Sequence, residues 1–228
     1  MLSAYPETTF PQIHLYLSRH GETIWNTQSR MQGRGDSDLT ERGIADARRL
    51  AEVLTGIPLQ AAFCSPAKRA METTRMALSG RSVPMILDER IHEMALGRYE
   101  GLTVQETYLL DHDNMDAFFY HPERFIPADG ESFADVVNRI RSFLDELTTD
   151  PMRLIHQDGA CNPGTDGCHI LIISHNITIK AMLAIMQNRP MAMLRDGPPI
   201  PQTSLIPVLY ERLSGEYHLL PLLSDVLQ

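Results

Sequence analysis

The chain has 228 residues, of which 43% are hydrophobic and 21% are charged. This length corresponds to one large domain or two small ones, and the composition excludes a disordered chain, a collagen and a coiled coil. The formal charge is −9, with 29 acidic residues against 20 Lys and Arg. A general nucleic-acid binder is excluded because it would carry a basic surface, whereas an anionic small-molecule ligand is not, since a small site can be basic inside an acidic protein.

The cysteine count and the apolar segments indicate the compartment. Cys64, Cys161 and Cys168 are too few, and odd in number, for a disulfide framework, which favours a reducing environment. Residues 1–12 contain no Lys or Arg and no apolar run, so no secretory signal is visible. The longest apolar stretch, 170–186, is interrupted by polar residues and is too short to span a membrane. We therefore expect a soluble, cytoplasmic protein without a membrane partner.

The first half of the chain alternates between strand and helix patterns. Strands are predicted at 13–18, 61–64 and 83–87, and helices at 39–56 and 65–78. Thr40 is a suitable N-cap for the first helix, and Gly56 closes it. Ser65 and Pro66 form the preferred N-cap and first-position pair, so they predict the start of the second helix.

The second half continues this alternation. A helix is predicted at about 103–119, a regular amphipathic helix at 132–147, a surface loop at 148–168, a strand at 169–174, a helix at 178–187 and a terminal hairpin with strands at 205–210 and 216–220. Strands that alternate with helices predict an α/β fold whose largely parallel sheet is covered on both faces, a three-layer α/β/α sandwich. No shift in composition divides the chain into two domains.

Basic side chains follow three of the predicted strands. Arg19 and His20 follow the first strand, Arg69 lies early in the helix after the second, and His175 follows the strand at 169–174. A single His or Arg at such a place is usually structural or solvated. The carboxyl ends of parallel strands meet at one edge of a sheet, however, so these groups are expected to converge. These groups and the free helix N-termini then predict an anion-binding pocket, because guanidinium forks match phosphate oxygens and helix N-termini offer free N–H groups.

Six strings carry a resemblance to a known family. They are LSRHGETIWN (17–26), QGRGDSDLTERG (32–43), SPAKRAMETTR (65–75), HEMALGRYEGLT (92–103), GES (130–132) and SHN (174–176). In this order they resemble the histidine phosphatase superfamily, in its branch of cofactor-dependent phosphoglycerate mutases and related phosphatases. The resemblance covers most of residues 13–210. It implies a single domain, 1–228, with a small helical cap inserted at about 98–131 and a surface loop at about 148–168.

The resemblance implies catalysis through a phosphohistidine. His20 matches the nucleophile, which needs a neutral nitrogen lone pair; neighbouring arginines favour it by lowering the pKa of His20, and a hydrogen bond to backbone near Gly21 is expected to select the tautomer. Glu93 matches the general acid that protonates the leaving oxygen, a role that requires partial desolvation. The residues matched to the clamp on the phosphoryl oxygens are Arg19, Arg69 and His175. The family implies no metal and no cofactor.

Other residues match positions that contact the substrate. Asn26 matches a phosphate-contacting amide, and Thr23, Gln32 and Gly33 flank the same pocket. The departures from the family pattern are Asn176 in place of Gly, Ile177 in place of an Asn that is common in mutases, and Asp38 in place of Pro. Asn176 either crowds the site or adds an amide to the ligand contacts. These departures lie outside the phosphoryl-transfer core, so they concern the identity of the substrate.

The choice between phosphatase and mutase depends on the segment after Glu93. Residues 99–131 contain eight acidic residues and one basic residue, Arg124, whereas a mutase is expected to hold a second acidic group with paired arginines. The apolar cap residues are Leu109, Leu110, Phe118, Phe119 and Tyr120; they line a lid for a less charged substrate, or pack the lid onto the body, which we favour for most of them. We therefore predict a phosphomonoesterase acting on a small-molecule phosphate ester.

Two alternatives remain open beside this prediction. The first is a phosphoglycerate mutase, and the less favoured second is a non-catalytic regulator that binds a phospholigand. We expect a monomer or homodimer without a nucleic-acid partner. A metal site is disfavoured, because the four metal-ligating side chains around the predicted loop, His156, Cys161, Cys168 and His169, lack the spacing of a CxxC or HxxxH core.

Overall fold

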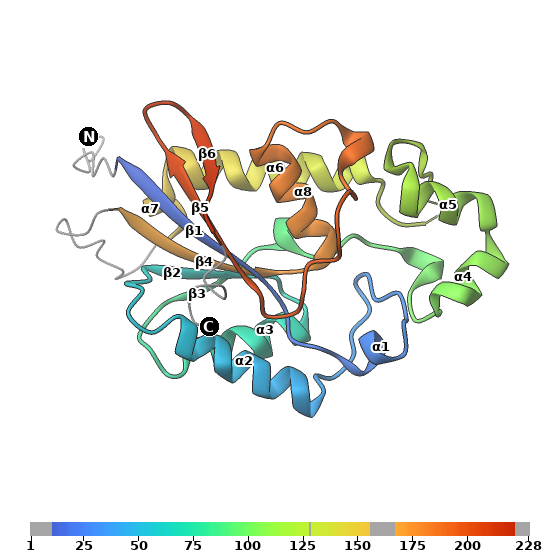
Figure 1. The fold of residues 1–228 in the computed structure, drawn as a ribbon, viewed down its shortest axis with the longest axis horizontal. Helices are drawn as coiled ribbons and strands as arrows, with labels where there is room; N and C mark the ends of the chain where they lie inside the picture. Colours follow the sequence, from blue (N-terminus) through green and yellow to red (C-terminus); the bar gives the residue numbers. More distant parts are fainter. Residues whose placement is uncertain (1–10, 128, 156–166, 222–228) are drawn as a thin grey trace, which may run out of the picture.

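A six-stranded sheet forms the centre of the structure, a computed structural model that describes residues 11–127, 129–155 and 167–221 (Figure 1). The strands are β1 (Gln12–Arg19), β2 (Ala61–Cys64), β3 (Met85–Leu87), β4 (Cys168–Ser174), β5 (Leu205–Glu211) and β6 (Glu216–Leu219). Their order is β3-β2-β4-β1-β5-β6. The first four run parallel, and β5 is antiparallel to both β1 and β6. This confirms the mostly parallel sheet and the terminal hairpin.

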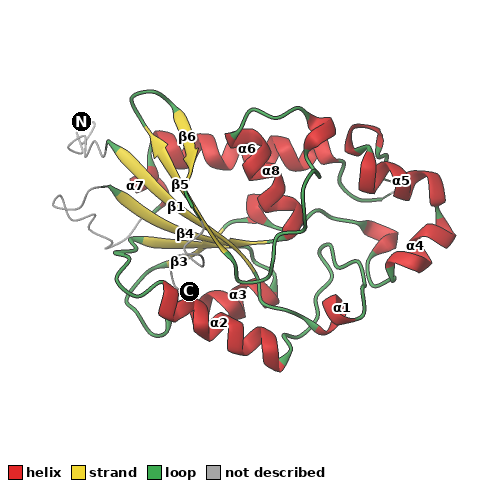
Figure 2. Cartoon of the chain, viewed as in Figure 1, coloured by secondary structure: helices red, strands yellow, loops and turns green. Residues whose placement is uncertain are grey.

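Helices cover both faces of this sheet (Figure 2). Helices α2 (Glu41–Val53) and α3 (Lys68–Leu78) lie on one face, and α6 (Phe133–Thr149) and α8 (Asn176–Met186) on the other. Successive residues of β1 alternate between the two cores: Leu15 packs with α6 and α8, and Tyr16 with α2 and α3. The period of two along a strand thus produces the predicted three-layer sandwich.

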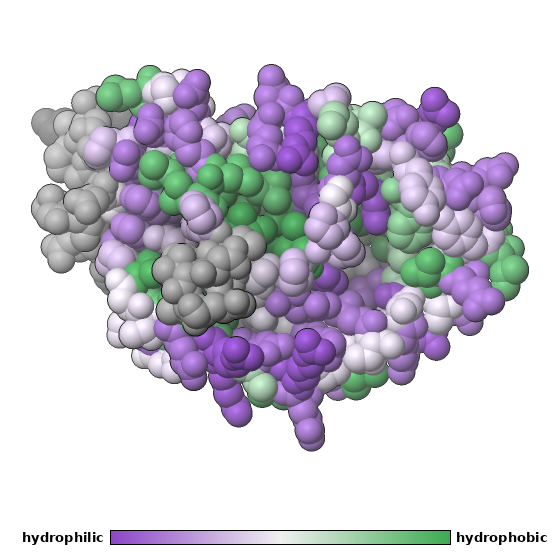
Figure 3. All heavy atoms as spheres, in the orientation of Figure 1, coloured by the Kyte–Doolittle hydropathy of each residue, from purple (hydrophilic) through white to green (hydrophobic). Residues whose placement is uncertain are grey.

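Helix α2 is polar on the side that faces solvent and apolar on the side that faces the sheet. The face shown in Figure 3 is hydrophilic over α2, whose inner side buries Ala47 and Leu50. None of the described helices is long and apolar enough to cross a membrane.

One of the two predicted helix starts that depend on a cap residue agrees with the structure. The Thr40 hydroxyl accepts a hydrogen bond from Gly43 N, and α2 begins at the next residue. The predicted start of α3 at Ser65 is wrong, because α3 begins at Lys68 after a cap residue without a side-chain cap bond. The Ser65 hydroxyl instead contacts His175. The helix predicted at 178 begins two residues earlier, at Asn176.

The segment 103–119 also differs from the prediction of one continuous helix. It forms α4 (Val104–Leu110) and α5 (His112–Tyr120), separated at Asp111. Asp111 adopts φ −158° and ψ 74°, and its carboxylate accepts hydrogen bonds from Tyr99 Oη (2.8 Å) and Arg98 Nη2 (2.7 Å). These tertiary bonds stabilise the break. Helices α4 and α5 form the cap, which extends to one side of the sheet beyond α8 (Figure 1).

Short elements complete the fold. They are α1 (Ile24–Thr27), α7 (Pro151–Leu154) and the 3₁₀ turns η1 (Glu89–Ile91), η2 (Gly97–Tyr99), η3 (Pro122–Arg124) and η4 (Met191–Met193). Helix α7 lies within the segment 148–168 that was predicted to be a loop. Residues 156–166 of that loop, with His156 and Cys161, lie outside the described residues.

Candidate functional site

The predicted convergence at one sheet edge is confirmed by three side chains. Arg69 Nε lies 3.3 Å from His20 Nε2, and Arg69 Nη2 lies 3.1 Å from His175 Nδ1. A pocket of about 150 Å³ opens beside them. The predicted site residues that line it are Arg19, His20, Asn26, Gln32, Gly33, Arg69, Glu93 and Asn176. Thr23 and His175 are fully buried and are not part of the pocket lining.

The geometry of His20 selects one tautomer. Its Nδ1 lies 2.8 Å from the Gly21 carbonyl oxygen, which can only accept, so Nδ1 carries the proton and Nε2 holds the lone pair. Burial lowers the pKa of His20 well below its usual value, with smaller contributions from the charges of Arg69 and Arg19. The expected backbone bond is thus confirmed, while the first cause of the lowered pKa is desolvation rather than the arginines.

Arg69 connects the two histidines and is 1% exposed. Its partners are His20 Nε2 (3.3 Å), His175 Nδ1 (3.1 Å), Gly33 O (2.9 Å), Gly35 O (2.8 Å) and Asp36 Oδ1 (3.0 Å). These five contacts match the five N–H donors of a guanidinium. Two of the five acceptors are neutral imidazole nitrogens, those of His20 and His175. An incoming phosphoryl oxygen can therefore replace an imidazole as acceptor while the ion pair between Arg69 and Asp36 stays intact.

His175 lies behind Arg69. Since a guanidinium can only donate, His175 Nδ1 is the acceptor, and Nε2 donates to Ser65 Oγ at 2.7 Å. Burial, followed by the charge of Arg69, lowers the pKa of His175 well below its usual value. Both nitrogens of this neutral ring are therefore engaged by protein, and His175 orients Arg69 instead of facing the pocket. Ser65 was missed as a site residue because its Ser-Pro context is also typical of a helix cap.

Glu93 lies at the N-terminus of α8. Its Oε1 accepts hydrogen bonds from Met94 N (3.0 Å), Thr178 Oγ1 (3.1 Å) and Thr178 N (3.3 Å), and its Oε2 accepts from Ile177 N (3.2 Å). The amides of α8 have no side-chain cap from His175, so this carboxylate takes that place. Glu93 is 8% exposed, as expected for a desolvated acid, and lines the pocket.

Arg19 supplies an unused donor. Its Nη1 donates to Ile200 O at 2.8 Å, whereas its Nε is buried and has no partner among the residues described. A buried N–H without an acceptor is costly, so a bound anion would satisfy it. Burial lowers the pKa of Arg19.

Thr23 organises the remaining polar wall. Its hydroxyl accepts from Gln32 Nε2 (2.7 Å) and Asn26 N (3.2 Å) and donates to Asn26 Oδ1 (3.0 Å). Gln32 Oε1 is buried and finds no donor within the described parts of the chain. Thr23 therefore positions two amides that line the pocket and does not contact the ligand space itself.

Asn176, which stands where the family has glycine, makes a structural hydrogen bond and also lines the pocket. Its Oδ1 accepts a hydrogen bond from Ile200 N at 2.9 Å, so the side chain ties α8 to the segment after η4. The same residue lines the pocket. The two other departures have structural places: the Ile177 amide bonds Glu93, and Asp38 pairs with Lys68 on the surface.

Two pocket arginines were not found from the sequence. Arg30 and Arg195 both line the pocket. Arg30 donates to Gly101 O (2.6 Å). The prediction of few basic groups considered only the cap segment, and it missed arginines that enter from outside it.

The apolar cap residues divide into two groups. Phe118 and Phe119 line the pocket, while Leu109, Leu110 and Tyr120 are 82%, 52% and 69% exposed. The expectation that most of the five pack the lid onto the body is therefore wrong.

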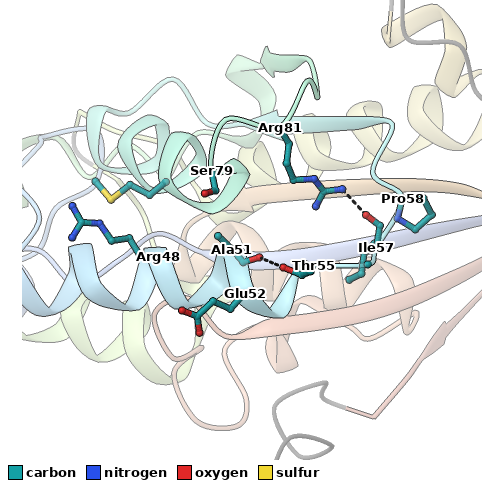
Figure 4. Close-up of a pocket in the computed structure, with 10 residues that line it drawn as sticks. Arg48, Ala51, Glu52, Thr55, Ile57, Pro58, Ser79 and Arg81 are labelled. Atoms are coloured by element: carbon teal, nitrogen blue, oxygen red, sulfur yellow. Dashed lines mark hydrogen bonds between the residues drawn. The ribbon is translucent and has the colours of Figure 1, made fainter.

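A second, larger hollow of about 870 Å³ lies between α2 and the end of α3 (Figure 4), and the chemistry does not need it. There Arg81 donates to the carbonyls of Leu54 (3.0 Å) and Ile57 (2.6 Å), which closes the C-terminal end of α2. Its lining has no histidine and no cysteine. In the described part of the chain, no three His, Cys, Asp or Glu side chains are grouped to hold a metal ion.

Comparison with known proteins identifies the family. The chain belongs to the histidine phosphatase superfamily (branch 1), whose family model matches residues 15–220. It is 30% identical over 170 residues to phosphoserine phosphatase 1 of Hydrogenobacter thermophilus, covering 75% of this chain and 74% of that protein. It is also 30% identical over 173 residues to 2,3-bisphosphoglycerate-dependent phosphoglycerate mutase 2 of Gloeobacter violaceus, covering 74% and 73%.

A solved structure has the same fold. Bacillus stearothermophilus YhfR superposes with a TM-score of 0.80 at 34% identity, over 91% of this chain and 95% of that one.

Proposed function

We propose that this protein is a phosphomonoesterase that hydrolyses a small-molecule phosphate ester through a phosphohistidine on His20. The observation that carries the proposal is the His20 tautomer. The bond from Nδ1 to the Gly21 carbonyl leaves the lone pair on Nε2, in a pocket shared with Arg19, Arg69 and Glu93. A neutral imidazole with its lone pair at a cationic pocket is suited to attack phosphorus.

The first step transfers the phosphoryl group to the enzyme. His20 Nε2 forms the N–P bond as the ester O–P bond breaks, and the Glu93 carboxyl gives its proton to the leaving oxygen. Arg19 Nε, which has no partner among the described residues, and the Arg69 donors now held by the imidazoles stabilise the equatorial oxygens. His175 and Ser65 act indirectly, by holding Arg69.

The second step releases inorganic phosphate. The Glu93 carboxylate accepts a proton from water as the water oxygen attacks phosphorus and the N–P bond breaks, which regenerates His20 with a free lone pair. The bonds from the first turn of α8 and from Met94 keep the carboxylate in the same place for both proton transfers.

Hydrolysis and mutase activity differ in what the cap holds. Arg124, the only Lys or Arg between residues 99 and 131, is exposed, lies beside Glu123 (3.4 Å) and does not line the pocket. This favours hydrolysis. The matched relatives include both a phosphoserine phosphatase and a phosphoglycerate mutase, and Arg195 in the pocket keeps the mutase as the second candidate.

The test measures phosphate release from p-nitrophenyl phosphate and product formation from 3-phosphoglycerate. We expect His20→Ala to lower kcat/KM by about a thousand-fold or more, and an acid-labile phosphoryl adduct on His20 in alkali-quenched wild-type protein. The control is His218→Ala, which removes a partly exposed imidazole on β6. Unchanged activity in His20→Ala would exclude the mechanism. Formation of 2-phosphoglycerate without phosphate release would assign the mutase, and ligand binding without turnover would assign the regulator.

A further inference from the structure

Arg195 is a cation in the pocket that the phosphoryl chemistry does not use. Its guanidinium carbon lies 4.5 Å from the ring centroid of Phe118 and 4.9 Å from that of Phe119, both on cap helix α5. Arg195 therefore lies on the cap side of the pocket, whereas Arg19 and Arg69 adjoin His20. The ester's alcohol part departs toward Glu93, and Glu93 lines the same pocket as Arg195.

The charges of the four pocket arginines are not equally balanced. Arg69 pairs with Asp36 (3.0 Å), and Arg30 lies 3.6 Å from Glu106. Arg19 and Arg195 form no ion pair with any carboxylate in the described residues, and Arg19 belongs to the phosphoryl end. This leaves Arg195 as an unpaired cation at the other end of the pocket. Burial lowers its pKa to about 10, so it stays charged at neutral pH.

The backbone that carries Arg195 is held by a buried lysine. Lys180 is 8% exposed, and its Nζ donates to the carbonyl oxygens of Arg195 (2.7 Å), Asp196 (3.1 Å) and Gly197 (2.9 Å). An ammonium has three donors, so all of them are used on this one turn. Asn176 holds the same segment further along, at Ile200. The turn is thereby fixed against α8, and the two phenyl rings restrict the guanidinium.

We infer that Arg195 is a specificity-determining residue that binds a carboxylate on the alcohol part of the substrate. A guanidinium with no accepting partner in the described structure offers two parallel N–H groups, which match the two oxygens of a carboxylate. A second phosphate dianion would call for more than one unpaired cation at the cap end. The inference rests on the proposed phosphatase function and restricts its substrates to phosphate esters of hydroxy acids or related carboxylic acids.

The test compares two esters that differ at one group. 3-Phosphoglycerate and glycerol 3-phosphate share the phosphate and the chain length, and only the first has a carboxylate. We expect Arg195→Gln to lower kcat/KM for phosphate release from 3-phosphoglycerate by roughly 10- to 100-fold, mostly through KM, as for loss of a charge-assisted hydrogen bond. Glycerol 3-phosphate should change by less than about 3-fold. The control, Arg48→Gln, removes an exposed arginine beside the distant hollow.

Binding to a catalytically blocked protein separates this inference from the proposed function. In His20→Ala, calorimetry should show tighter binding of 3-phosphoglycerate than of glycerol 3-phosphate, and added Arg195→Gln should remove that difference. An equal loss for both esters would mean that Arg195 acts through Glu93, and no loss for either would mean that it does not meet the substrate; each result overturns the inference. Absence of turnover with the binding preference intact would instead refute only the phosphatase.

Discussion

Replacing Ser65 with alanine tests whether the hydroxyl is part of the site or only of the fold. Ser65 and His175 are both fully buried, and their bond is 2.7 Å long. Removing Oγ leaves the His175 Nε2–H without an acceptor and without access to water. A buried donor left unsatisfied costs about 1–3 kcal/mol, so we expect the free energy of unfolding to fall by about 2 kcal/mol in urea titrations.

A loss of stability cannot by itself separate a role in the site from a role as a helix cap, because losing a helix cap also costs about 1 kcal/mol. The catalytic activity of the variant separates these two roles. If Ser65 positions His175, and His175 positions Arg69, then kcat/KM for phosphate release should fall about tenfold, equivalent to about 1.4 kcal/mol in the barrier. A simple cap would leave kcat/KM unchanged. The assay is steady-state hydrolysis of an aryl phosphate at a temperature where both proteins are fully folded.

Thr74→Val is the matched control. Thr74 is equally buried, and its hydroxyl donates to Ala70 O (2.8 Å) and contacts Cys64 Sγ (3.0 Å) without touching the site. We expect it to lose stability but to keep kcat/KM within about twofold. Equal stability losses in Ser65→Ala and Thr74→Val, with kcat/KM preserved in both, would refute the role given to Ser65.

Four further predictions concern buried groups of the described structure. The buried histidines are His20, His92 and His175, and burial is the first cause of each lowered pKa, with that of His92 falling to about 4. The unfolded chain therefore binds protons below about pH 6.5 that the folded protein does not, so the free energy of unfolding should fall from pH 6.5 toward 4; a flat profile there would contradict these environments. At pH 6, kcat/KM should show no loss from nucleophile protonation, whereas an ordinary imidazole would be neutral in only about a quarter of molecules. Lys180→Met should lower the unfolding free energy by about 2–3 kcal/mol in urea, because three carbonyls lose a charged donor. Gly43→Ala should cost about 1–3 kcal/mol, since its Cβ would overlap the backbone of Glu22; an unchanged Tm would show that this close approach is not required.

Local patterns identified the elements that depend on neighbours in the chain. The strand at 13–18 and the strand at 169–174 were recognisable because each is an apolar run that ends in polar residues, and both are present as β1 and β4. Thr40 identified the start of α2 because a cap bonds an amide only three residues away. The same reasoning failed at Ser65, where a partner 110 residues away takes the hydroxyl.

The candidate site could be predicted only in part for the same reason. Parallel strands bring their carboxyl ends to one edge, so the meeting of His20, Arg69 and His175 followed from the order of the elements. The order of the elements does not say which ring faces the ligand space, and here His175 lies behind Arg69. Arg195 carried no local signal, since its importance arises from the rings of α5 and the turn held by Lys180.

The sequence by itself determined the α/β class, the edge at which the site forms and the family, because these depend on periodicity and on short motifs. Only the tertiary structure decided the break in the cap at Asp111, the tautomers of the two histidines and the distribution of charge in the pocket. Those features depend on hydrogen bonds and burial between distant segments. A net charge of −9 therefore coexists with an unpaired arginine in the pocket, because the balance of charge within a site is set by which side chains meet there, and not by their total number.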